Sequence, residues 1–204
     1  MKRRQSFLSL LCVLLLSLFT FLQAQQHSVS TSQSIAPCRE FVLKLPVGVA
    51  EQIKAVALTQ VGVTEVGQNR GEPDKYNKSV NSPLGAAYCQ AHWFWCGERT
   101  CCNPYPKTGL ASLARKDLEK KSHQRNSRDA IRQNTFAMVY WQFPNSIYGH
   151  ADGQIQQLEG GWVLVIAPNS SDDDPRNGGG VNLKKRNLNH PLARMRLQSR
   201  IYFI

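Results

Sequence analysis

The 204 residues contain no internal repeat and no long low-complexity segment, so the length suits one domain with a core of its own. The longest apolar run, residues 7–22, is shorter than the roughly 20 residues that span a membrane. The acidic run Asp172-Asp173-Asp174 lacks the ligand spacing of an EF-hand loop. No calcium site and no membrane-spanning helix are therefore predicted.

Acidic residues are scarce. The sequence has 14 Asp and Glu against 25 Lys and Arg, and its formal net charge is +11. A basic protein is attracted to polyanions such as a bacterial wall, an acidic glycan or a membrane surface. The basic residues at 184–186 and 194–200 form either a binding patch or an ordinary solvated face. Nucleic acid is not expected as a partner.

The N-terminus has the composition of a secretory signal peptide. Lys2, Arg3 and Arg4 precede the apolar run, and the small residue Ala24 follows it. Residues 1–24 are predicted to be the signal, and the protein to be exported to the periplasm or beyond the cell. The alternative is an uncleaved anchor, because Leu22 occupies a position where cleavage favours a small residue. Residues 25–48 are interpreted as a flexible lead-in, and 49–204 as the folded domain.

Six cysteines become five once Cys12 leaves with the signal. An odd number in an oxidising compartment indicates disulfide pairs plus one free thiol. Cys89 is the natural free thiol, and the remaining four form two disulfides or one, with the pairing open: Cys38, Cys96, Cys101, Cys102. The other interpretation is a zinc site made from the last three and His92.

The apolar periodicity changes along the domain. Helical spacing is found in 49–62, from Cys89 to about Arg99, and in 108–121. Short β-branched or aromatic runs follow, separated by Gly and Asn turns, at 136–143, 151–158, 162–167, 181–185 and 200–204. Helices followed by an antiparallel meander predict an α+β fold, with the N-terminal helices packed on a C-terminal sheet.

Cys89 is the candidate nucleophile. A turn of small residues leads into it and an aromatic run follows, which places the thiol on the first turn of a buried helix. Free backbone N–H groups and the helix dipole favour a thiolate there. The base that it requires is His150 at the start of a predicted strand, and Asn169, at the end of the next strand, is predicted to orient the imidazole.

These blocks resemble CHAP-type peptidoglycan hydrolases of the NlpC/P60 cysteine peptidase superfamily. Residues 57–76 resemble the opening of that domain, and Ala87-Tyr88-Cys89-Gln90-Ala91 resembles its nucleophile helix. The segment 108–111, the Gly149-His150 pair, and 169–186 resemble the later parts of the domain, so the likeness covers about residues 51–204. It implies a papain-like α+β fold, a Cys89-His150-Asn169 mechanism and no metal or organic cofactor.

Three positions depart from the family pattern. Ala167 stands where many relatives carry an acid, and Asp152 where relatives usually have glycine. His92 replaces an apolar residue. Asp152 is expected either to support the imidazole or to cap a turn. Oxyanion stabilisation is assigned to the Cys89 backbone N–H, with the Tyr88 hydroxyl as a possible side-chain donor.

The expected function is thus that of an exported peptidoglycan amidase or endopeptidase, monomeric, with peptidoglycan as its partner. One alternative is a pseudoenzyme that binds the wall without cutting it, which the missing acid at Ala167 motivates. The other is a cysteine peptidase or transglutaminase-like enzyme that acts on proteins. The same catalytic residues serve all these chemistries, so their spacing cannot separate them.

Overall fold

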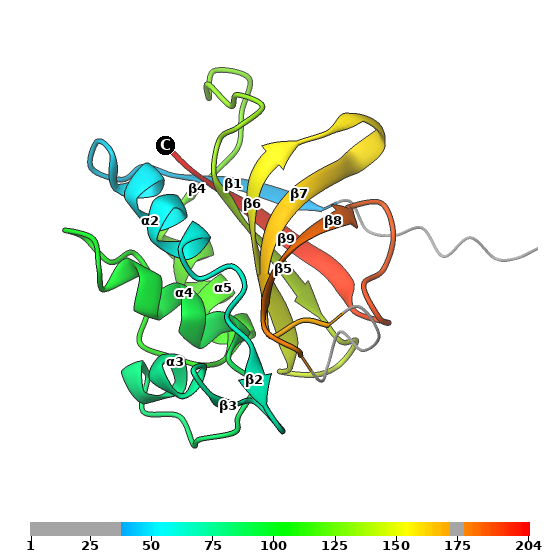
Figure 1. Cartoon of the computed structure of the whole chain (residues 1–204). Helices are drawn as coiled ribbons and strands as arrows, with labels where there is room; N and C mark the ends of the chain where they lie inside the picture. Colours follow the sequence, from blue (N-terminus) through cyan, green and yellow to red (C-terminus); the bar gives the residue numbers. More distant parts are fainter. Residues whose placement is uncertain (1–37, 172–177) are drawn as a thin grey trace, which may run out of the picture. The chain divides into compact units, whose positions relative to one another are not determined.

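The computed structural model describes residues 38–171 and 178–204. Within these ranges the chain forms four α-helices and a seven-stranded, mostly antiparallel sheet, which confirms the predicted α+β class (Figure 1). The signal peptide, the first part of the lead-in and the acidic run 172–174 lie outside the described residues.

The helices are α2 (Val49–Leu58), α3 (Asp74–Ser79), α4 (Cys89–Gly97) and α5 (Ala111–Lys121). In α2 the buried residues Val49, Ile53 and Ala57 recur every four positions, as an amphipathic helix requires. The short helix α3 lies in a Gly- and Asn-rich stretch for which no helix was predicted, and it buries Tyr76. None of the helices described is long and apolar enough to cross a membrane.

The large sheet has the strand order β4-β1-β9-β5-β6-β7-β8. Its members are β1 (Arg39–Leu43), β4 (His123–Gln124), β5 (Ala137–Gln142), β6 (Gly149–Gln157), β7 (Trp162–Pro168), β8 (Val181–Asn187) and β9 (Arg196–Phe203). Strands β5 to β8 form the predicted meander. The final strand instead crosses to the other side of β5. A separate two-stranded ribbon joins β2 (Glu65–Val66) and β3 (Arg70–Gly71).

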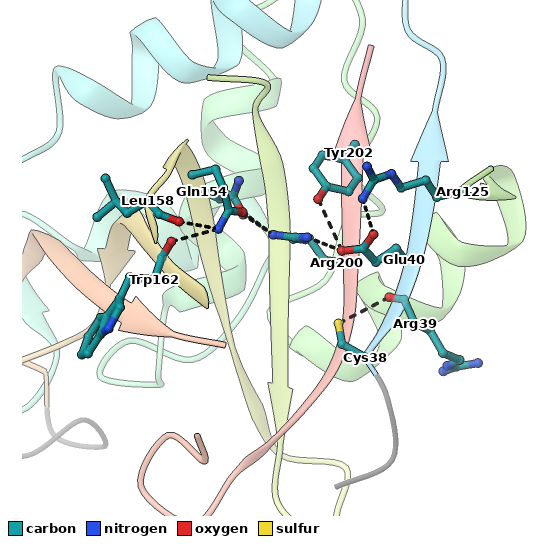
Figure 2. A network of polar contacts seen from close by, with 10 residues as sticks. Cys38, Arg39, Glu40, Arg125, Gln154, Leu158, Trp162, Arg200 and Tyr202 are labelled. Atoms are coloured by element: carbon teal, nitrogen blue, oxygen red, sulfur yellow. Dashed lines mark hydrogen bonds and ion pairs between the residues drawn. The ribbon is translucent and has the colours of Figure 1, made fainter. Parts of the chain in front are cut away.

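The folded domain begins before residue 49, so the flexible lead-in predicted for 25–48 is wrong in its last part. Residues 39–43 form β1, which pairs in parallel with β9 and antiparallel with β4. Charge pairing across these strands explains why: the Glu40 carboxylate lies between Arg125 and Arg200 and also accepts a bond from Tyr202 (Figure 2). Burial tends to raise the pKa of Glu40, but the two guanidinium groups outweigh it and lower that pKa.

The two faces of the sheet bury different side chains. On β5, Met138 and Tyr140 join the core shared with the helices, whereas Val139 and Trp141 pack in a second cluster on the opposite face. This alternation follows from the two-residue period of a strand. The helices cover only the first face (Figure 1).

Helix α4 is buried almost completely and is held directly against β6. The Trp93 indole N–H donates a hydrogen bond of 3.1 Å to the Ala151 carbonyl. The Trp93 ring also lies over Gly153, where an added Cβ would come within 2.2 Å of the ring carbon Cη2. The absence of a side chain at Gly153 therefore allows the helix to approach the strand this closely.

All five cysteines in the described residues are free thiols, so the predicted disulfides are not formed. Cys96 is buried among the helices, and Cys38 packs near Trp141 on the other face of the sheet. Cys101 and Cys102 are exposed and adjacent in the loop after α4. Cys38, Cys96 and the adjacent pair Cys101 and Cys102 thus lie in three different parts of the domain.

We predict that Gly153→Ala destabilises the fold by about 1–3 kcal/mol, because Trp93 is both fully buried and hydrogen-bonded and so cannot move away from the new methyl group. Urea unfolding measures this change in the free energy of unfolding. Gly179→Ala is the matched control, since the nearest atom to its added Cβ is 3.7 Å away. Equal stability of the two variants would contradict the close helix–strand contact.

Candidate active site

Cys89 is the first residue of α4 and its side chain is nearly buried, with 4% of the residue exposed. The turn at residues 83–88 leads directly into the first turn of α4, and Tyr88 occupies the N-cap position. No side chain caps the helix there. Backbone N–H groups of the first turn, which have no partner within a helix, are consequently available to a negative charge on or beside the sulfur.

His150 is the second residue of β6 and is brought to the same place. The Cys89 sulfur lies 4.0 Å from the carbonyl oxygen of Gly149, the residue just before His150. Cys89 is also near enough to the His150 imidazole to contribute to the raised pKa of that ring. The structure therefore brings together the predicted nucleophile and the predicted base from two elements distant in sequence.

Asp152 holds the other side of the imidazole. Its Oδ1 lies 2.7 Å from His150 Nε2, so the remaining ring nitrogen, Nδ1, is left for the thiol. The second oxygen, Oδ2, accepts bonds from Trp141 Nε1 at 3.2 Å and Arg186 Nε at 3.3 Å. Asp152 is fully buried, and these three donors compensate the cost of burying its charge.

The pKa values of His150 and Asp152 are shifted by these contacts. Burial alone would lower the pKa of His150, but the charge and hydrogen bond of Asp152, together with Cys89, raise it to about 10. Burial would raise the pKa of Asp152, and His150 and Arg186 outweigh that effect and lower it. At neutral pH the buried carboxylate is thus ionised and the imidazole is protonated.

The imidazole is hydrogen-bonded to Asp152 and not to Asn169 among the described residues, so Asp152 is better placed for the orienting role predicted for Asn169. Asn169 adopts a left-handed backbone conformation with φ of 55° at the end of β7, and its Oδ1 has no hydrogen-bond partner among the described residues. In the antiparallel pairing Gly153 is opposite Ile166, and one further step along both strands matches Asp152 with Ala167. The acid absent from β7 is therefore supplied from the facing position on β6.

Support of the imidazole was one of the two roles predicted for Asp152, and the strand period favours it over the turn cap. Residues i and i+2 of a strand share a face, so Asp152 must point to the same side as His150 once both are placed in one strand. The contributions of Trp141 and Arg186 were not predictable in this way, because they come from neighbouring strands. The sequence predicts a binding patch or a solvated face for the basic segment that includes Arg186, yet the Arg186 side chain reaches inward to Asp152.

Four buried polar atoms on or near the start of α4 lack partners in the described part of the chain: Glu65 Oε2, Tyr88 Oη, Gln90 Nε2 and Asn169 Oδ1. Backbone bonds join the segments involved, since Glu65 N–H donates to Gly179 O and Gly179 N–H to Ser170 O. Burial raises the pKa of Tyr88, so its hydroxyl keeps its proton and remains a donor. Unpaired buried polar groups are rare in stable cores and gather at functional sites.

A cavity of about 420 Å³ opens beside Cys89. It lies between the loop before α4, the loop before α5 and the turn between β5 and β6. Its lining is mostly small or apolar, and consists of Val80, Ser82, Pro83, Ala86, Ala87, Cys89, Lys107, Thr108, Gly109, Leu110, Ala111, Ile147, Tyr148 and Gly149. A substrate placed in it would reach the sulfur.

A second Cys–His pair in the same helix is structural. Cys96 Sγ lies 3.7 Å from His92 Nε2, both are buried, and burial lowers the pKa of His92 to about 3. His92 also packs edge-on against Tyr76 and Trp93. The alternative zinc site is not assembled, because the described residues contain no cluster of three or more His, Cys, Asp or Glu arranged for a metal.

Comparison of the chain with protein-family models, with curated proteins and with solved structures finds no match. The site is therefore interpreted from its own geometry.

We predict that Asp152→Asn lowers the pKa of His150 from about 10 to, or below, its ordinary value of 6.5, because burial then acts without the compensating carboxylate. NMR titration of isotope-labelled histidine measures this directly. Asn169→Ala is the control and is expected to leave the titration in place. If Asn169→Ala lowers the pKa as much as Asp152→Asn does, Asn169 is the orienting residue after all.

Proposed function

We propose that this protein is an exported peptidoglycan hydrolase, an amidase or endopeptidase with a papain-like arrangement of its active site. The observation that supports this best is the alignment of Cys89, His150 and Asp152 beside an open cavity. Nucleophile, base and orienting group stand in the order that covalent acyl transfer requires.

In the first step the Cys89 thiolate attacks the carbonyl carbon of a wall amide. A C–S bond forms and the carbonyl oxygen becomes an oxyanion, which the Cys89 backbone N–H and the Tyr88 hydroxyl would stabilise. The C–N bond then breaks. His150, protonated at neutral pH, gives its proton to the leaving amine while Asp152 fixes the ring.

In the second step water replaces the amine. Neutral His150 now removes a proton from the water, the hydroxide attacks the thioester carbon, and the C–S bond breaks. The products are a carboxylate and an amine, and the thiolate–imidazolium pair is restored. The pair Asp152–Arg186 keeps its charges throughout, so it acts by positioning His150 rather than by transferring protons.

A wall substrate is favoured by three features that are independent of the site's geometry. Residues 1–24 have the composition predicted for an export signal, the chain has a formal net charge of +11, and its motif blocks resemble the CHAP family. A basic protein accumulates on an anionic wall without a separate binding module. The protein-directed peptidase remains the second candidate, since the same three residues would serve it.

The pseudoenzyme interpretation loses its main motive. That interpretation was motivated by the missing acid at Ala167 on β7. Asp152, on the neighbouring strand β6, supplies a carboxylate that bonds the His150 imidazole instead.

Digestion of purified peptidoglycan tests the proposal. The wild-type protein is expected to release fragments whose masses identify the bond cut, and Cys89→Ala to release none, because the covalent step is lost. Cys96→Ala serves as the control, since that thiol is buried away from the cavity and its loss should leave the product pattern unchanged. Mass spectrometry of the soluble fraction reads both results.

The other outcomes are equally definite. Binding of wild type to the wall without any cleavage would establish a wall-binding pseudoenzyme. Cleavage of protein substrates with neither cleavage nor binding of the wall would establish the peptidase instead.

We further predict that Tyr88→Phe lowers kcat by about 10²-fold, as expected for loss of one oxyanion donor. The free energy of unfolding should hardly fall, because the Tyr88 hydroxyl has no partner among the described residues. Steady-state kinetics and urea unfolding of the same variant measure the two effects. An unchanged kcat would remove Tyr88 from the oxyanion site.

A further inference from the structure

We infer that the cavity beside Cys89 binds the part of the substrate that carries a free carboxylate, and that Lys107 is the residue that recognises it. This inference rests on the proposed function, because it concerns the substrate of the same site. It adds the chemical class of the group next to the bond that is cut.

Lys107 is the single charged side chain in the lining of the cavity. It is exposed and makes no ion pair or side-chain hydrogen bond within the described part of the chain. Two other lysines do have acidic partners on the protein, since Lys54 pairs with Glu51 and Lys121 with Asp117. An unpaired ammonium group at the edge of a substrate cavity is therefore available to an anion supplied by the substrate.

Two helix N-termini reinforce this preference. Cys89 begins α4 and Ala111 begins α5, and both residues line the cavity. No side chain caps either helix. The positive ends of two helix dipoles thus face the same space as Lys107, and no Asp or Glu lines it to oppose them.

The remaining lining fits an extended peptide. Gly109, Gly149 and the alanines at 86, 87 and 111 have small or absent side chains, so a substrate backbone can approach closely. Ser82 and Thr108 add hydroxyl groups to the same lining. At the rim Ile147 and Tyr148 are 58% and 64% exposed, which provides an apolar surface for the aliphatic part of the same segment.

Alkylation of Cys89 tests the charge preference without any wall substrate. Iodoacetate and iodoacetamide have nearly the same size and both transfer a two-carbon group to sulfur, forming a C–S bond and releasing iodide, but only iodoacetate carries a carboxylate. With the full chain, Lys107→Gln is expected to lower the rate ratio of iodoacetate to iodoacetamide at Cys89 by about fivefold. Mass spectrometry of the Cys89 peptide separates this thiol from the exposed Cys101 and Cys102.

Two variants control the measurement. Lys107→Arg should retain the ratio, and Lys120→Gln, which removes the same charge from an exposed position outside the cavity, should not change it. In parallel, wild type should digest native peptidoglycan faster than peptidoglycan whose carboxylates have been amidated, and Lys107→Gln should lose this difference.

The failures are distinguishable. A Cys89 that reacts readily but with a ratio indifferent to Lys107 overturns the carboxylate site and leaves the hydrolase proposal standing. Equal digestion of native and amidated wall by wild type overturns it as well. A Cys89 that reacts with neither reagent contradicts the proposed function itself.

Discussion

The hydrogen bond from Trp93 to the Ala151 carbonyl sets the distance between the two halves of the site. Trp93 lies one helical turn after Cys89, and Ala151 directly follows His150. A single contact, made possible by the absence of a side chain at Gly153, therefore fixes the position of Cys89 relative to His150. The rest of the helix layer packs around this contact. A change that disrupts the core packing here would therefore also displace the Cys89 thiol.

Electrostatically the site is a row of alternating charges that extends inward from the cavity. The Cys89 thiol is followed by the imidazolium of His150, then by the carboxylate of Asp152 and the guanidinium of Arg186. Each buried charge thus has an opposite neighbour, which is the condition under which burial of ions is tolerated. His92 shows the alternative: without a carboxylate its pKa falls to about 3, so burial alone leaves an imidazole neutral.

Local patterns predicted most of the elements, because helical periodicity and strand alternation are properties of short segments. Strand β1 was missed because its five residues include Arg39 and Glu40, and their place in a sheet depends on Arg125 and Arg200, far along the chain. Cys89 and His150 were identifiable from their flanking residues. The partner of His150 was not, since the choice between Asp152 and Asn169 depends on the geometry of the two strands.

The parallel pairing of β1 with β9 has a consequence for the order of folding. Strand β9 lies between β1 and β5, so neither has its full set of hydrogen bonds until residues 196–203 have been synthesised. Pairing of strands this distant in sequence is slow, because a long loop must close first. A chain emerging from the ribosome therefore lacks the centre of its sheet until this last strand has been made. The sheet that carries His150 and Asp152 is complete only when the final strand is in place.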